Sequence, residues 1–107
     1  MNFASTAGIR PLPKSPHYIA AKAGVIALTE YFAHSFAPNI RVNCIAPGFV
    51  LTENHKPSKY KSYDNIIESI PLNRMATIQD IADAVVYLLK AKNVTGHTLV
   101  VDGGLIL

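Results

Sequence analysis

Apolar residues recur with a helical period in the last third of the chain. They occupy positions i, i+3, i+4, i+7 and i+8, as Ile81, Ala84, Val85, Leu88 and Leu89. This spacing places them on one face of an amphipathic helix. Thr77 precedes the run and can cap the helix, with Asp80 in its first turn. The pattern therefore predicts a helix that starts at Thr77 and is broken at Thr95-Gly96.

A second long helix is predicted in the first half of the chain. Ser15 is of a type that caps free backbone N–H groups, and Pro16 suits the first helical position. Pro38 disfavours helix in the residue before it, so the helix should end near Ala37. The predicted helix also contains several small residues, which allow close approach to a sheet or another helix: Ala20, Ala23, Gly24 and Ala27.

Three short apolar segments have the length expected of strands, at residues 1–5, 40–46 and 98–101. A short helix is expected over residues 64–70, between the second strand and the last helix. Strands and long helices then alternate as two βαβ units. We therefore expect an α/β fold with three parallel strands and crossover helices.

Composition and charge exclude several classes of function. Lys and Arg residues are scattered along the chain, so the net charge of +3 does not indicate nucleic-acid binding. No stretch approaches the roughly 20 apolar residues of a membrane span. The start of the chain does not resemble a signal peptide. Cys44 is the only cysteine and lies in an apolar run, where a buried thiol is expected. A cytoplasmic location is expected from these features.

The candidate chemistry lies on and around the first predicted helix. Tyr18 and Lys22 stand four residues apart, which places both side chains on one helix face. A neighbouring ammonium group favours the ionised form of a phenol, and such a phenol can exchange protons with a substrate. Ser5 follows the first strand and Pro47-Gly48 the second, and sites in parallel α/β folds form at such strand ends. These residues are expected to line one edge of the sheet.

Four segments in the same order and spacing resemble the short-chain dehydrogenase/reductase family, and they span most of the chain: Ser5 to Gly8, Tyr18 to Gly24, Ile40 to Gly48 and Thr95 to Gly104. The resemblance implies the carboxyl-terminal part of a Rossmann-type doubly wound parallel sheet. It also implies oxidoreductase activity, in which a carbonyl is reduced or an alcohol is oxidised with NAD or NADP.

The resemblance assigns roles to individual residues. Tyr18 resembles the catalytic acid/base, and Ser5 resembles the residue that hydrogen-bonds the substrate oxygen. Lys22 resembles the residue that favours ionisation of the tyrosine and binds the nicotinamide ribose. Further cofactor contacts are implied along the segment after the second strand, at Pro47, Gly48, Val50 and Thr52. Residues 53–70 resemble the variable segment that covers the substrate. No metal site is expected, because the four histidines lack ligand spacing.

The glycine-rich turn that holds the cofactor pyrophosphate in this family has no counterpart among the six glycines. Residues 1–107 are therefore expected to form one partial domain that lacks the dinucleotide-binding half and is inactive as an isolated chain. The alternative is a non-enzymatic remnant, which would act, if at all, by self-association or by docking on a complete relative.

The substrate and the partners stay open at this point. The resemblance implies a small carbonyl or alcohol substrate, and 3-oxoacyl-reductase-like and pteridine-reductase-like members match about equally well. Association is expected either as a homo-oligomer or with a complete relative, because the family packs the helix that carries the tyrosine against its copy.

Overall fold

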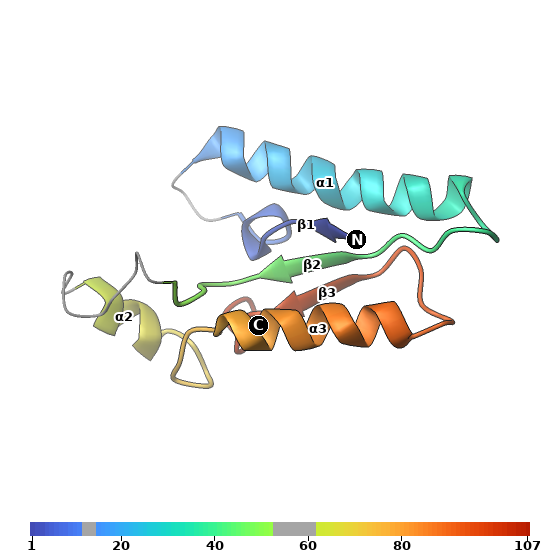
Figure 1. Ribbon diagram of the computed structural model, residues 1–107. Helices are drawn as coiled ribbons and strands as arrows, with labels where there is room; N and C mark the ends of the chain where they lie inside the picture. Colours follow the sequence, from blue (N-terminus) through green and yellow to red (C-terminus); the bar gives the residue numbers. More distant parts are fainter. Residues whose placement is uncertain (12–14, 53–61) are drawn as a thin grey trace.

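The computed structural model describes residues 1–11, 15–52 and 62–107. Three strands form one sheet in the order β1-β2-β3, with β1 at Asn2–Phe3, β2 at Cys44–Pro47 and β3 at Thr98–Val101. Both pairs of neighbouring strands are parallel. The expected three-stranded parallel sheet is thereby confirmed, and the carboxyl ends of all three strands point the same way (Figure 1).

The strands are shorter than the sequence predicted. The expected second strand began at residue 40, but β2 starts at Cys44, and β1 ends at Phe3 rather than near Ser5. The pairing of β1 with β2 starts at Asn2 and Cys44, and the Asn2 amide also donates to the Asn43 carbonyl at 2.9 Å. Ser5 leaves the ladder because it is the N-cap of a 3-10 helix, η1, at Thr6–Gly8.

Helices cover both faces of the sheet, as the alternation of side chains along a strand requires. Cys44 and Ala46 of β2 pack with Val25 and Ile26 of α1, which spans Pro16–Ser35. On the other face, Pro47 and Phe3 lie beside apolar residues of α3, which spans Ile78–Lys90. Figure 1 shows the sheet between these two helices. The buried thiol of Cys44 confirms its expected place in the core.

The cap predicted for α3 is present. The Thr77 hydroxyl accepts a hydrogen bond from the Asp80 amide at 3.1 Å, and the Asp80 carboxylate accepts one from the Thr77 amide at 2.7 Å. Arg74 also donates to this carboxylate at 2.7 Å. The guanidinium group of Arg74 and the two Thr77 donors hold the pKa of Asp80 well below its usual range.

The N-cap position predicted for α1 is confirmed, but the predicted side-chain cap is absent. Ser15 is the N-cap residue, but its side chain makes no capping hydrogen bond. Its backbone carbonyl instead accepts the first helical bond from Ile19 at 3.0 Å. The helix also ends at Ser35, two residues before the expected limit.

A short helix, α2, occupies Ser62–Glu68 rather than residues 64–70. In the described part of the chain, no helix is long and apolar enough to cross a membrane.

One side chain fastens the end of α3 to the segment just before β2. The Arg41 guanidinium donates to the carbonyl oxygens of Leu88, Leu89, Ala91 and Val94 at 2.9 to 3.1 Å. The last carbonyls of a helix have no partner within the helix and carry its negative end charge, so a cation is well suited to them. Arg41 therefore caps α3 from outside the helix.

We predict that Arg41→Met lowers the free energy of unfolding by about 2–3 kcal/mol, because a charged donor to several carbonyls is lost. Arg41→Lys should lose part of this amount, since an ammonium cannot reach all four oxygens with the fork of a guanidinium. Urea denaturation at one fixed protein concentration measures both. Lys92→Met removes an exposed cation nearby and serves as the control; an equal loss in the control would contradict the prediction.

Candidate active site

A glycine brings the segment after β1 close to α1. A Cβ atom added at Gly8 would lie 2.7 Å from the carbonyl carbon of Lys22 and 2.8 Å from the amide nitrogen of Ala23. Real Cβ atoms do not approach backbone atoms so closely, so only glycine allows η1 to lie against α1 at this point. Ser5, at the start of η1, is held by the same packing and accepts a hydrogen bond from the Ala7 amide at 3.2 Å.

Tyr18 and Lys22 share one face of α1, as their spacing predicted. The Lys22 Nζ atom lies 5.7 Å from the centroid of the Tyr18 ring, within the range of a cation–π contact. Nζ also donates a hydrogen bond to the carbonyl oxygen of Phe3 at 3.0 Å. Lys22 thus bridges the end of β1 and the tyrosine ring.

Two cavities open beside Tyr18, and four residues line both of them. These are Ser5, Tyr18, Gly48 and Phe49. We call the smaller one, of about 280 Å³, the inner cavity, and the larger one, of about 430 Å³, the outer cavity. Tyr18 is 44% exposed, so this residue is accessible from the solvent. The carboxyl ends of β1 and β2 therefore meet at the predicted edge.

The segment predicted to contact a cofactor lines the outer cavity at every position. Pro47, Gly48, Val50 and Thr52 all contribute to its wall. Backbone hydrogen bonds with Ala76 hold this segment, because Leu51 donates to it at 2.8 Å and it donates to Phe49 at 2.9 Å. Lys22 is not among the described residues that line either cavity, and its Nζ atom is instead bonded to the Phe3 carbonyl.

Several lining residues were not identified from the sequence. Phe49 follows the predicted Pro47-Gly48 turn directly, so its place in the sequence could have identified it as a residue of the site. Tyr63 lines the outer cavity and lies in the stretch 53–70 expected to cover a substrate, of which 53–61 fall outside the described residues. Leu105 lines the inner cavity from the far end of the chain. No sequence pattern linked Leu105 to Tyr18, because only the tertiary fold brings them together.

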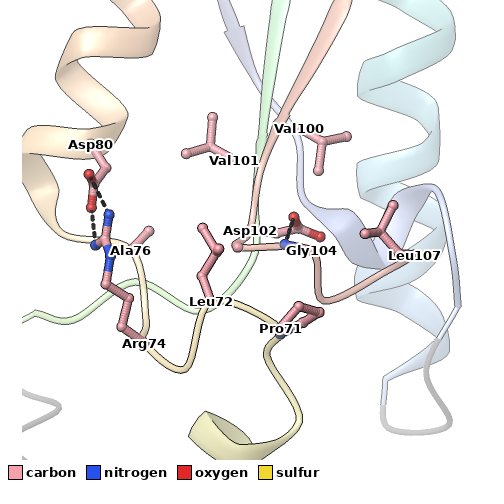
Figure 2. Close-up of a pocket in the computed structure, with 11 residues that line it drawn as sticks. Pro71, Leu72, Arg74, Ala76, Asp80, Val100, Val101, Asp102, Gly104 and Leu107 are labelled. Carbon is pink, nitrogen blue, oxygen red and sulfur yellow. Dashed lines mark hydrogen bonds and ion pairs between the residues drawn. The ribbon is translucent and has the colours of Figure 1, made fainter.

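A further cavity, of about 460 Å³, lies between the end of β3 and the start of α3 (Figure 2). Its charged groups already have partners. Arg74 pairs with Asp80, and the Asp102 carboxylate accepts from the Gly104 amide at 2.8 Å. None of Ser5, Tyr18 and Lys22 lines this cavity, so we do not place the candidate chemistry there. Among the described residues, no cluster of three or more His, Cys, Asp or Glu side chains could hold a metal ion.

Comparison with known proteins places this arrangement in a family. A family model described as enoyl-(acyl carrier protein) reductase matches residues 1–106. The chain is 30% identical to a short-chain dehydrogenase/reductase from Brucella melitensis, described as glucose/ribitol dehydrogenase. The two superpose with a TM-score of 0.89 over 98% of this chain and 44% of that structure. The chain belongs to the short-chain dehydrogenase/reductase family.

Two other members bear on the chemistry of the family. The 3-oxoacyl-(acyl-carrier-protein) reductase of Chlamydia muridarum is 37% identical over 108 residues, which cover 98% of this chain and 44% of that reductase. A 4-hydroxyisoleucine dehydrogenase solved with NADH is 35% identical, with a TM-score of 0.85 over 98% of this chain and 44% of that chain. This short-chain dehydrogenase/reductase sequence therefore spans less than half the length of these relatives.

We predict opposite effects for two alanine substitutions in the packing around Tyr18. Gly8→Ala should lower the free energy of unfolding by about 1–3 kcal/mol, because the new methyl group meets the backbone of α1. Gly24→Ala should raise it by about 0.5–1 kcal/mol, because no atom lies within 4 Å of the added Cβ and alanine favours helix. Denaturant titration of both variants measures the difference. A Gly8→Ala variant as stable as the parent would refute the close approach.

Proposed function

We propose that this chain is the catalytic part of an NAD(P)(H)-dependent short-chain oxidoreductase, which reduces a carbonyl or oxidises an alcohol with Ser5, Tyr18 and Lys22. The observation that carries the proposal is the shared lining of both cavities by Ser5 and Tyr18, with Lys22 Nζ 5.7 Å from the tyrosine ring. A hydroxyl and a phenol then face one accessible space, and an ammonium group lies against the ring of the phenol.

Each of the three residues has a task in carbonyl reduction. The Tyr18 phenol donates its proton to the substrate oxygen as the carbonyl becomes an alcohol. The Ser5 hydroxyl donates a hydrogen bond to the same oxygen and stabilises the charge that develops there. The Lys22 ammonium stabilises the phenolate that Tyr18 leaves behind. One of its protons is bonded to Phe3, so two others are available for ribose hydroxyls.

The outer cavity fits the nicotinamide end of the cofactor. Its wall combines the apolar side chains of Pro47 and Val50 with the hydroxyl of Thr52, which suits a flat ring that carries a polar amide. Bound reduced nicotinamide would supply the hydride to the carbonyl carbon. The pyrophosphate and adenosine need a further site, so we propose that residues 1–107 work as one part of a larger domain.

The inner cavity favours an acyl substrate. Ile19, Phe49 and Leu105 give it apolar walls beside Ser5 and Tyr18. A carbon chain gains free energy against these apolar side chains. The hydroxyl-bearing residues Ser5, Thr6, Ser15 and Tyr18 line the same cavity and suit the polar end of such a substrate. Together with the similarity to the 3-oxoacyl-(acyl-carrier-protein) reductase of Chlamydia muridarum, this supports a 3-oxoacyl thioester as the substrate.

We predict that the catalytic role of Tyr18 is visible once a dinucleotide-binding half is supplied. The chain is fused behind the corresponding half of the Chlamydia muridarum reductase, and NAD(P)H oxidation is followed with a 3-oxobutanoyl thioester. Tyr18→Phe should lower kcat/KM by about 10²–10⁴-fold, since the proton donor is lost. Tyr87→Phe, on α3 and 57% exposed, is the matched control and should change it less than twofold.

The isolated 107-residue chain is the second control. It should show no turnover, because the binding energy of the remote part of the cofactor also positions the reacting end. Tyr18→Phe activity within a few fold of the parent fusion would overturn the proposed role. Micromolar cofactor affinity of the isolated chain would overturn the proposal that the pyrophosphate and adenosine need a site outside residues 1–107.

We further propose that the chain associates, either as a homo-oligomer or with a complete relative. Two apolar surfaces support this. One is the outer face of α1, where Leu28 is 52% and Tyr31 64% exposed. The other is a groove beside β1 and α3, lined by Phe3, Ile78, Val86 and their neighbours. β1 is also an edge strand in the described sheet, and such edges pair readily with other chains.

We predict that sedimentation across a dilution series finds the isolated chain larger than its 11.6 kDa monomer. Leu28→Lys should weaken association if the α1 face is the contact, and Ile78→Lys should weaken it if the groove is the contact, because a buried unpaired charge is costly. A monodisperse monomer that unfolds cooperatively would contradict the proposal.

A further inference from the structure

The chain after β3 folds back as a compact turn over residues 102–107. The buried carboxylate of Asp102 holds this turn from inside, because it accepts hydrogen bonds from the amides of Gly104 at 2.8 Å and Ile106 at 3.1 Å. Leu107 donates to the Gly104 carbonyl at 3.2 Å and closes the turn. We call residues 102–107 the tail.

The tail is also held from outside by a residue of the segment that carries Ser5. The Arg10 guanidinium donates to the main-chain oxygens of Ile106 at 3.1 Å and Leu107 at 2.8 Å. The Arg10 amide is itself bonded to the Thr6 carbonyl at 2.9 Å, so Arg10 is tied to η1. These two bonds join parts of the chain that are 96 and 97 residues apart.

Leu105 belongs to the tail that Asp102 and Arg10 hold, and it forms part of the inner cavity. It lines that cavity together with Ser5 and Tyr18. It also packs close to the turn after β2, since a Cβ atom added at Gly48 would lie 3.5 Å from Leu105 Cδ2. A shift of the tail therefore changes the size of the inner cavity.

We propose that Arg10 is a positioning residue that fixes the tail as one wall of the inner cavity, and that Leu105 thereby limits the length of the acyl chain that fits. The part that concerns Leu105 rests on the proposed function, because it assumes that the substrate occupies the inner cavity. The part that concerns Arg10 does not, because it is a statement about the order of the tail.

The first test is amide hydrogen exchange of the unliganded 107-residue chain. Arg10→Met should speed exchange at the amides of Leu105, Ile106 and Leu107 about tenfold, because two charge-assisted hydrogen bonds are lost and Asp102 still holds the turn. Arg10→Lys should have a smaller effect, since an ammonium lacks the fork. Amides of β2 report global unfolding and should keep the parent rate, and Lys92→Met controls for the loss of a cation.

The second test measures which acyl chain the inner cavity prefers. Pantetheine thioesters of 3-oxobutanoate and 3-oxooctanoate are titrated into the same chain, and NMR shifts of the Leu105 and Ile19 methyl groups are followed. Leu105→Ala should improve the affinity for the longer thioester relative to the shorter by about tenfold, as the removed methyl groups make room for methylenes. For this variant the Ile19 methyl groups are the reporter. Arg10→Met should shift the preference in the same direction.

The outcomes separate the two parts of the proposal. Unchanged tail exchange in Arg10→Met would overturn the positioning role of Arg10. Faster exchange with an unchanged thioester preference would overturn the role of the tail in specificity. If neither thioester shifts the methyl signals of the parent chain, the proposed acyl substrate fails and the role of Leu105 fails with it, while the exchange result still decides the role of Arg10.

Discussion

The polar contacts between residues 41–43, just before β2, and the loop that leaves α3 hold the two βαβ units together. Besides Arg41, the buried Asn43 donates to the Val94 carbonyl at 2.9 Å and accepts from the His97 amide at 3.0 Å. The Val42 amide donates to the Thr95 hydroxyl at 3.1 Å. A buried polar group without a hydrogen-bond partner costs more free energy than a typical hydrogen bond at the surface contributes to stability. The loop is therefore fixed on β2, which sets the register of β3.

That register determines where the site forms. With β2 and β3 paired from Cys44↔Thr98 to Pro47↔Val101, both strands end at the same level, and the turn at Gly48 meets Asp102. Gly8 makes the matching close approach on the other side, between η1 and α1. The candidate site thus depends on two glycines that allow backbone contact as much as on the reactive side chains. Ser5, Tyr18 and the turn after β2 come from three segments that meet only at this edge.

The proposed function and the exposed apolar surfaces have a common basis. The chain holds the residues proposed here for proton transfer, the segment proposed to face the nicotinamide and one wall of the proposed substrate cavity, while the relatives it matches are more than twice as long. A parallel sheet normally continues with further strands and helices on both faces. The uncovered groove beside β1 and the outer face of α1 are the surfaces where such partners would bury apolar area. A complete active site and a covered surface would therefore arise in the same assembly.

Local patterns in the sequence determined the order of helices and strands along the chain, the Thr77 cap and the pairing of Tyr18 with Lys22. All of these depend on spacings of a few residues. The order and spacing of the motifs also identified the family, and they singled out the segment from Pro47 to Thr52, which lines the outer cavity. The lengths of β1 and β2, the missing side-chain cap at Ser15 and the contacts of Arg10, Arg41 and Leu105 were decided by the tertiary structure. These features depend on groups that are distant in the sequence. A donor such as Arg10 finds its acceptors 96 and 97 residues away only after the sheet has brought them together.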